Sequence, residues 1–182
     1  MKSKSKGMTF IEVLVALFVM VTGILGAVAM QATAKKGSFD AMQRSVASAL
    51  AQDILERIRS NDPDPALIET YEGTYGAVLN AVPGNRCDSA VAACTPAQMV
   101  TNDLFEWEMM LMGADVTNGA ANVGGLVGAR GCITHLDNAL TVVVSWQGRD
   151  DISDGASNTA IAQACGNATD KRRQVEISAF VF

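Results

Sequence analysis

The pattern of apolar and polar residues predicts a membrane-spanning helix near the N-terminus. No charged residue occurs in residues 13–34, a span of 22 residues. A helix needs about 20 consecutive apolar residues to cross the hydrocarbon core of a bilayer. This segment is therefore long enough and apolar enough to span a membrane.

Beyond Lys35 the pattern becomes that of an amphipathic helix. Apolar residues recur at intervals of three and then four, at Phe39, Met42, Val46, Leu50, Ile54 and Ile58. The sequence Ser60-Asn61-Asp62-Pro63 supplies a stop signal. We therefore predict one helix over residues 8 to about 60, roughly 80 Å long at about 1.5 Å per residue. Its second half needs a domain to cover the apolar stripe.

A second, shorter helix is predicted after an irregular connector. Residues 63–95 are rich in Gly, Pro, Ala and Asn, which is typical of a connector without regular structure. Thr95 and Pro96 then suit the N-cap and the first helical position. The helix is expected over residues 97–111, where Met99, Leu104, Trp107 and Leu111 share one face.

The C-terminal part has the texture of β-strands. Three segments are expected to be strands, at residues 123–134, 139–146 and 174–182. Leu140, Val142, Val144 and Trp146 alternate with the residues between them. An antiparallel sheet of at least three strands follows, and its apolar face is the expected cover for the long helix. The predicted fold class is α+β.

Glu12 is the residue in the N-terminal segment that most needs an explanation. It lies just inside the apolar run, where an ionised carboxylate costs about 2.5 kcal/mol or more unless it is paired. A cut between Gly7 and Met8 would create an amino group four residues before Glu12, available to that carboxylate in the same or a neighbouring chain. The simpler interpretation is a residue at the membrane edge that reaches the headgroups.

The residues around this acid resemble the class III signal of type IV pilins and of the pseudopilins of type II secretion. A short basic leader ends in Gly7 and is followed by Met8-Thr9-Phe10-Ile11-Glu12-Val13 and an unbroken apolar helix. Met at the first mature position, where Phe is commoner, and Phe10, where Leu is usual, are mild departures that keep the apolar character. An ordinary secretory signal is disfavoured by the length of the apolar run and by Glu12.

The resemblance implies how the chain is processed and arranged. A prepilin peptidase would cut after Gly7 and methylate Met8, and Glu12 would set the register between subunits. The expected segments are a leader (1–7), the membrane and assembly half of the helix (8–34) and a periplasmic pilin domain (35–182). The fold implied is pilin-like, with the long helix packed on a C-terminal antiparallel sheet. The chain is expected to cross the inner membrane once before it enters a filament on the cell surface.

Several segments resemble minor pilins of the PilV type more than a generic pilin. These segments are residues 22–31, 55–61, 103–107, 131–133 and 140–146. The resemblance implies a low-abundance subunit that primes pilus assembly and lies at or near the filament tip, with roles in twitching motility and adhesion. Its partners would be other minor pilins, the major pilin, the prepilin peptidase and the assembly platform. The alternative is a minor pseudopilin of type II secretion.

The positions of the cysteines agree with export. Four cysteines, Cys87, Cys94, Cys132 and Cys165, all follow the apolar segment, so disulfides in an oxidising compartment are expected. Cys87 with Cys94, and Cys132 with Cys165, are plausible pairs, but four cysteines allow three pairings.

Loss of the three leader lysines takes the formal charge from −5 to −8. That sign disfavours nonspecific nucleic-acid binding.

The sequence indicates no active site, metal site or cofactor. His135 has no second histidine with which to form a metal cluster. Asp150, Asp151 and Asp154 do not have the spacing of a calcium-binding loop, and a solvated acidic loop is favoured. An exported enzyme on a membrane anchor is accordingly the least favoured class, and a structural subunit is favoured.

Overall fold

The computed structural model describes residues 7–61, 64–88, 93–119 and 121–180. The chain divides into two compact units, Met1–Phe39 and Asp40–Phe182, and we call the second unit the head. Helix α1 (Phe10–Ser60) contributes its first part to the first unit and its last part to the head. Most of the predicted leader, residues 1–6, and the stop residues Asp62 and Pro63 lie outside the described residues.

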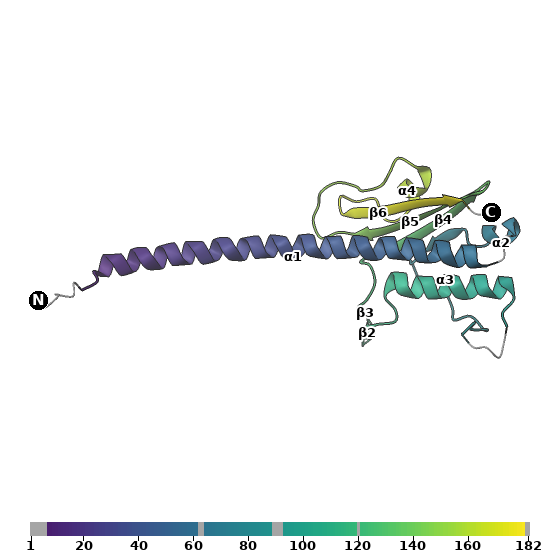
Figure 1. The fold of residues 1–182 in the computed structure, drawn as a ribbon, viewed down its shortest axis with the longest axis horizontal. Coiled ribbons are helices and arrows are strands. Elements are labelled where there is room, and N and C mark those ends of the chain that lie inside the picture. Colours follow the sequence, from purple (N-terminus) through teal and green to yellow (C-terminus); the bar gives the residue numbers. More distant parts are fainter. Residues whose placement is uncertain (1–6, 62–63, 89–92, 120, 181–182) are drawn as a thin grey trace, which may run out of the picture. The chain divides into compact units, whose positions relative to one another are not determined.

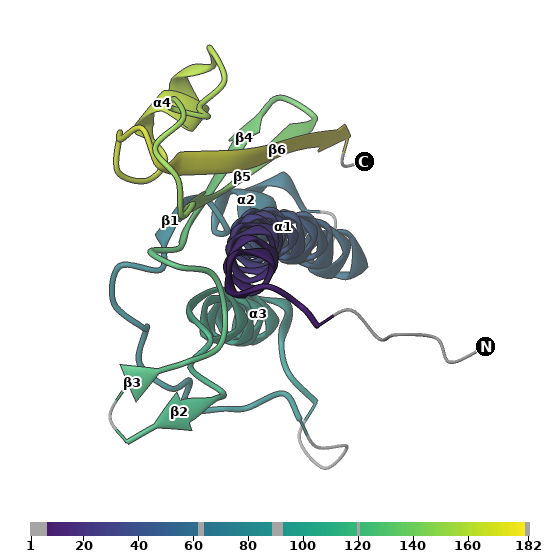
Figure 2. The ribbon, with the colours of Figure 1, turned by 90° about the vertical axis from the view of Figure 1, so that its left-hand side faces the viewer.

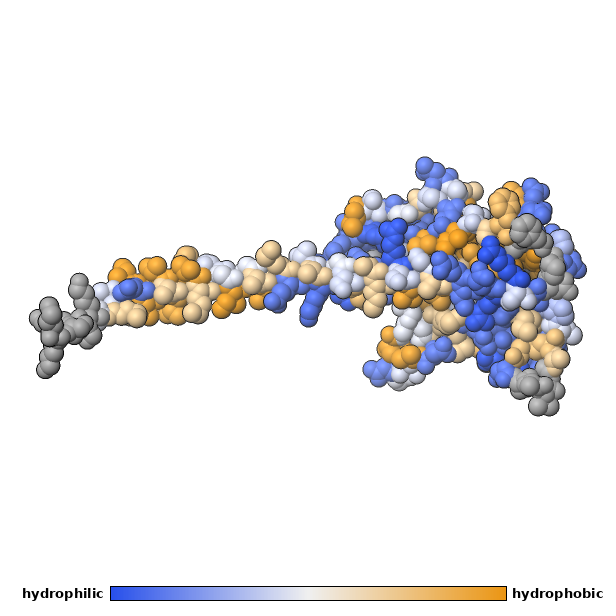
Figure 3. Space-filling model, in the orientation of Figure 1, coloured by the Kyte–Doolittle hydropathy of each residue, from blue (hydrophilic) through white to orange (hydrophobic). Residues whose placement is uncertain are grey.

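The first unit is helical from Phe10 onward and presents an apolar surface. It contains the one helix, among the described residues, that is long and apolar enough to cross a membrane. Its large apolar side chains are exposed, and apolar colouring covers most of this stretch (Figure 3). The predicted long N-terminal apolar helix is confirmed, although it begins at Phe10, two residues after the expected start.

The head packs its part of α1 between an antiparallel sheet and a second long helix. The sheet has the strand order β1-β4-β5-β6, with β1 (Gly73–Tyr75), β4 (Arg130–Leu136), β5 (Ala139–Gln147) and β6 (Arg172–Phe180). Helix α3 (Pro96–Met112) lies on the other side of α1 in both ribbon views (Figures 1 and 2). The predicted combination of a long helix and a C-terminal antiparallel sheet is therefore confirmed.

The buried face of α1 differs from the predicted stripe at its beginning. Leu50, Ile54 and Ile58 are buried as expected. Met42 and Val46 are exposed, so the stripe is wrong at these two positions. The sheet and α3 approach α1 from two sides and bury a broader set instead, namely Gln43, Ala47, Leu50, Ala51, Ile54, Leu55 and Ile58. Met42 and Val46 lie on a side of the helix that neither element covers.

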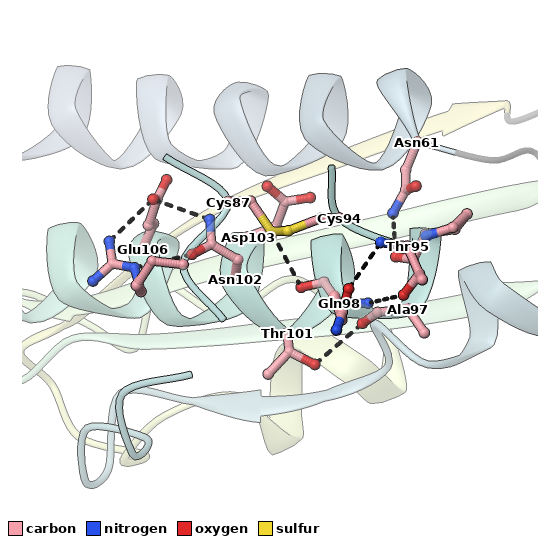
Figure 4. The surroundings of a disulfide bond; sticks show 12 residues. Asn61, Cys87, Cys94, Thr95, Ala97, Gln98, Thr101, Asn102, Asp103 and Glu106 are labelled. Carbon is pink, nitrogen blue, oxygen red and sulfur yellow. Dashed lines mark hydrogen bonds and ion pairs between the residues drawn. A yellow bond between two sulfur atoms is a disulfide. The ribbon is translucent and has the colours of Figure 1, made fainter. Parts of the chain in front are cut away.

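The helix predicted after the connector is confirmed in position and in its cap. Thr95 is the N-cap: its hydroxyl accepts a hydrogen bond from the Gln98 amide, and the Gln98 side chain accepts one from the Thr95 amide, at 2.9 Å (Figure 4). This reciprocal pair satisfies two amides that the helix itself leaves free. The helix ends at Met112 because Gly113 takes the left-handed conformation, φ 64°.

The region predicted as an irregular connector contains two short elements that the sequence did not indicate. Helix α2 (Pro65–Glu69) is capped by Asp64, whose side chain accepts a hydrogen bond from the Ala66 amide. Strand β1 then pairs with β4, so that Tyr75 lies opposite Gly131. A helix of five residues and a strand of three are too short to produce a periodic pattern.

The first strand expected in the C-terminal part begins later than predicted. Residues 123–129 are not strand, and β4 covers only Arg130–Leu136. Gly125 and Gly128 have φ values of 70° and 59°, which interrupt an extended backbone. Two short strands, β2 (Thr117–Asn118) and β3 (Ala121–Asn122), form a separate hairpin before this turn. Residues 181–182 of the last predicted strand lie outside the described residues.

Two disulfides join the four cysteines. Cys87 and Cys94 close a small loop before α3, with Cα atoms 5.8 Å apart (Figure 4). Cys132 of β4 bonds Cys165, the C-cap of helix α4 (Ala160–Ala164), and both are buried with Val143. The second bond therefore holds α4 on the sheet face opposite α1. Of the three pairings that the sequence left open, the structure contains Cys87–Cys94 with Cys132–Cys165.

Candidate functional site

The predicted processing site lies just before the start of α1. Gly7, Met8 and Thr9 are exposed and not helical. The Thr9 carbonyl accepts hydrogen bonds from the amides of Glu12 and Val13, at 3.1 and 3.3 Å, and so begins the helix. The Gly7–Met8 peptide bond is thus in accessible non-helical backbone, the form of backbone that a peptidase can bind. Cleavage at this bond and methylation of Met8 stay predictions.

Glu12 occupies the first turn of α1. An acid there is favoured by the positive end of the helix dipole, by about 0.3–1 kcal/mol. Its neighbours Phe10 and Ile11 are 80% and 70% exposed. No described residue forms a hydrogen bond or an ion pair with the Glu12 carboxylate. The site therefore presents an acid on an apolar surface, and its pairing with the amine that cleavage would create stays a prediction.

The Thr22 hydroxyl and two glycines shape the surface of the apolar part of α1. Thr22, the first hydroxyl residue after Thr9 within this run, donates to the carbonyls of Phe18 and Val19, both at 3.0 Å, so its hydroxyl is satisfied within the helix. At Gly23 and Gly26 an added Cβ would meet nothing within 4 Å. These two glycines leave a smooth surface against which another helix can approach closely.

A polar network ties α1 to α3 inside the head. Arg57 binds Asp53 at 2.8 Å on its own helix and reaches across to Asp103 at 3.2 Å and Glu106 at 3.0 Å on α3. Tyr71 donates to the second oxygen of Asp103 at 2.9 Å. Asp103 is only 5% exposed, so these bonds replace the water that its carboxylate loses.

The ionisation of this network follows from its contacts. Burial acts to lower the pKa of Arg57, but its hydrogen bonds to the carboxylates of Asp53 and Glu106 outweigh burial and raise it above the ordinary value. Burial raises the pKa of Asp103, and the bonds from Tyr71 and Arg57 oppose that rise. For Glu106 burial acts upward, yet bonds from Asn102, Arg57 and Arg86 together lower its pKa. The charged cluster is thus centred on Arg57.

Sequence reasoning missed this network and could have found part of it. Asp53 and Arg57 stand four residues apart on a predicted helix, a spacing typical of an ion pair. Asp103 and Glu106 stand three apart on the second predicted helix. Nothing local indicates that the two pairs meet, because that depends on how the helices pack.

The residues considered for catalysis and metal binding have structural contacts. The Asp154 carboxylate accepts two hydrogen bonds from Arg172, at 2.6 and 2.5 Å, and Arg172 is buried at the start of β6. The backbone amide of His135 donates to Glu72. No group of three or more His, Cys, Asp or Glu side chains is arranged to hold a metal ion in the part of the chain that the structure describes.

The fold and the site together define a class of protein: a subunit with an N-terminal apolar helix that fits membrane anchoring, an acid in the first turn of that helix, and an α+β head packed around its second half. Residues 2–28 match the prokaryotic N-terminal methylation motif, and residues 29–105 match the family described as type IV pilin Tt1218. The two matches together cover residues 2–105 and support a type IV pilin. No curated protein and no solved structure matches the chain significantly.

These two matches indicate the general role of the chain. Type IV pilins are structural subunits rather than enzymes, and a chain with this signal interacts with other pilins and with a prepilin peptidase. The apolar helix and the signal fit anchoring in a membrane followed by entry into a pilus. The protein is accordingly a pilin or pseudopilin subunit.

Proposed function

We propose that the protein is a minor pilin of a type IV pilus, a low-abundance subunit that joins other minor pilins to prime assembly and lies at or near the filament tip. The observation that carries the proposal is the position of Glu12, in the first turn of α1, directly before the uncharged residues 13–34 and four residues after Met8. A carboxylate at that depth needs a cation. Cleavage after Gly7 supplies one on every mature chain.

In this proposal Glu12 of one subunit pairs with the methylated amine of Met8 in its neighbour. The subunit waits in the inner membrane with its head in the periplasm, and the assembly platform moves it into the filament. The pair forms only when two chains reach one axial register, because a shift of one turn moves the charges about 5 Å apart. Pairing in an apolar setting strengthens the attraction and so fixes the register.

The PilV-type assignment draws support from the segments that resemble that group. In the folded head, residues 55–61 end α1 and supply Arg57, while residues 103–107 supply Asp103 and Trp107 on α3. Residues 131–133 and 140–146 belong to β4 and β5, and Gly131 lies against Trp107. Segments that are separate in sequence thus contact one another in one core.

The second candidate function is a minor pseudopilin of a type II secretion system. The same signal and the same apolar helix favour it. The two candidates differ in phenotype: deletion of the gene is expected to remove surface pili and twitching, whereas for a pseudopilin it would leave exoproteins in the periplasm. Complementation with the full-length chain is expected to restore pili.

The processing step is tested by intact mass. The wild-type protein from sheared pili is expected to lack residues 1–7 and to carry one methyl group on Met8. A bulky replacement, Gly7→Phe, is expected to keep the leader and to stay in the membrane. Wild-type protein that keeps its three leader lysines and never enters sheared filaments would overturn the proposal.

A further inference from the structure

The head carries an uncharged surface segment that includes the β2–β3 hairpin. Residues 116–129 contain no charged side chain. Three valines of this segment, Val116, Val123 and Val127, are 57%, 57% and 52% exposed. Apolar colouring gathers over the hairpin in the space-filling view (Figure 3). Single exposed apolar residues are ordinary on a protein surface, but three of them in one short uncharged segment call for an explanation.

The fold presents two of these valines together. Thr117 pairs with Asn122 in the hairpin, and the next pair outward is Val116 with Val123, whose amide donates to the Val116 carbonyl at 2.8 Å. Side chains of paired residues lie on one face of an antiparallel pair. The base of the hairpin is tightly packed, because a Cβ added to Gly113 would come within 1.9 Å of the carbonyl carbon of Gly124. The exposure of Val116 and Val123 is therefore built into the fold.

The uncharged segment is fixed to the beginning of the head's part of α1. The side chain of Gln43, which is buried, accepts a hydrogen bond from the Val127 amide at 3.3 Å and donates one to the Gly125 carbonyl at 3.5 Å. Gln43 follows Asp40, the first residue of the head, by three positions. The hairpin accordingly lies toward the end of the head at which its helix begins, on the side of α3 (Figures 1 and 2).

The length of the chain keeps this end of the head near a bilayer that α1 spans. The uncharged residues 13–34 end at Lys35 and Lys36, and lysines at the end of a spanning helix place their ammonium groups among the lipid headgroups. Asp40 follows Lys36 by four residues, so their Cα atoms are at most about 14 Å apart. This bound holds for every angle between the two compact units. The hairpin thus belongs to the part of the head that connectivity holds closest to the lipid.

We propose that the β2–β3 hairpin is a second membrane contact, at which Val116 and Val123 insert between the headgroups and acyl chains of a phospholipid bilayer. Apolar side chains on an uncharged surface gain by leaving water there and carry no ionised group into the lipid. Asp115, exposed directly before the hairpin, limits the depth of insertion. The partner follows from the tether to the membrane helix, so this inference rests on the part of the proposed function in which α1 spans the inner membrane.

The contact is confined to one side of α1. On the other side, the loop after β5 carries Arg149, Asp150 and Asp151. Ionised groups of this kind are costly to move into the lipid, so that side stays in water. The uncharged hairpin and the charged loop together tilt the head toward the bilayer on the α3 side, which holds the waiting subunit in a defined orientation.

Photo-crosslinking in the full-length protein tests the contact. A diazirine residue at Val123 is illuminated after the protein is reconstituted, at a low ratio of protein to lipid, in vesicles of phosphatidylcholine and phosphatidylglycerol. Mass spectrometry is expected to find lipid adducts at several times the yield from the same residue at Leu136. Leu136 is the matched control, since it is 75% exposed but ends β4, about 20 Å along the strand from Arg130. Equal yields at Val123 and Leu136 would overturn the proposal.

A substitution across the hairpin tests whether the valines act together. Val116→Ser is expected to lower the yield of lipid adducts from Val123 roughly three- to fivefold, which corresponds to the loss of one partly inserted valine. Its thermal midpoint in detergent should equal that of the wild type, because Val116 is exposed. Leu136→Ser is the control and should leave the yield from Val123 unchanged. A yield that Val116→Ser does not lower, or adducts that join two protein chains in place of lipid, would assign the hairpin to another role and contradict the proposal.

A third position separates this inference from the proposed function. The same diazirine residue at Val21, within the apolar run, is expected to give lipid adducts at the highest yield. Adducts at Val21 without adducts at Val123 mean that only the hairpin contact is wrong. No lipid adducts at Val21 would overturn the membrane-spanning helix and the hairpin contact with it. Lipid adducts at both positions support the contact, and they do so even if the wild-type protein never enters sheared filaments, the outcome in which only the proposed function fails.

Discussion

Gly131 of β4 lies directly against the ring of Trp107 of α3. A Cβ added to Gly131 would come within 2.2 Å of Cη2 of Trp107. Trp107 is fully buried, packs edge-to-face on Tyr75 with ring centroids 5.7 Å apart, and donates to the Leu50 carbonyl. One indole thus joins α1, α3, β1 and β4, and it fits because the sheet has no side chain at that point.

Gly131→Ala is expected to destabilise the head. The methyl group would displace Trp107, and overpacking of this kind costs about 1–3 kcal/mol. The thermal midpoint of the detergent-solubilised protein, followed by tryptophan fluorescence, should fall by about 2–12 °C, since each kcal/mol shifts it by about 2–4 °C in a chain of this size. Gly84→Ala is the control, because an added Cβ there meets nothing within 4 Å, and it should change the midpoint little. Equal midpoints for Gly131→Ala and wild type would refute the close contact.

Local signals in the sequence predicted the elements that depend on local physics. The absence of charge over residues 13–34 predicted the apolar helix, and the Thr95-Pro96 pair predicted where α3 begins. The alternation from Leu140 to Trp146 predicted β5, whose even-numbered residues face α1. Each of these depends on residues close together in the chain, so a periodic pattern is sufficient to find it.

The features that the sequence did not predict depend on contacts between distant residues. Met42 and Val46 fit the helical stripe, but no element covers them. In the sequence nothing distinguishes Gly131 from the other glycines, because its role depends on its contact with Trp107. Asp40 and Trp146 are far apart in sequence, and only the packing of α1 on the sheet brings them to one pocket. Tertiary packing decides these positions and no local pattern encodes it.

Arg57→Met is expected to weaken the packing of α3 on α1. It leaves the buried carboxylate of Asp103 without its cation, at a cost of about 2–4 kcal/mol. The thermal midpoint should fall accordingly. Arg59→Met is the matched control on the same helix, because Arg59 pairs with the largely exposed Glu56 and such pairs contribute about 0–1 kcal/mol.

A second substitution separates the charge effect from simple loss of packing. Asp103→Asn in the Arg57→Met background removes the uncompensated charge and should recover part of the lost midpoint. If the double variant is as unstable as the sum of the two single variants, the ion pair does not explain the stability.

The two disulfides are expected to differ in their contribution to stability and in their ease of reduction. The Cys132–Cys165 bond closes 33 residues and the Cys87–Cys94 bond closes 7, so chain entropy gives about 4 and about 2 kcal/mol. Replacing the first pair by serines should therefore lower the thermal midpoint more. Cys132 and Cys165 are also buried, so mild reductant with alkylation and mass spectrometry should label Cys87 and Cys94 first. Simultaneous labelling of all four would contradict this order.

Acid is expected to release the loop before α4. The hydrogen bonds from Arg172 lower the pKa of Asp154 below its ordinary value of 3.8. A carboxyl whose pKa is lower in the folded state stabilises that state above pH 3.8 and loses this effect as the pH falls through the folded value. Asp154→Asn should therefore lower the thermal midpoint at pH 6, and the difference from wild type should shrink below pH 3.8. Asp151→Asn, at an exposed pair with Lys171, is the control and should have little effect at either pH.

Glu12→Ala is expected to separate membrane residence from assembly. An acid within the apolar run opposes insertion by about 2.5–3.5 kcal/mol, so its removal should leave the amount in the membrane unchanged or higher. Leader removal should continue, because Gly7 and Met8 are unchanged. Entry into filaments should fall, because the amine of the neighbouring Met8 would lose its partner. Intact mass and the ratio of sheared to envelope protein measure both effects, with Glu56→Ala in the head as the control. Normal incorporation of Glu12→Ala would remove the electrostatic basis for register and leave apolar packing alone to set it.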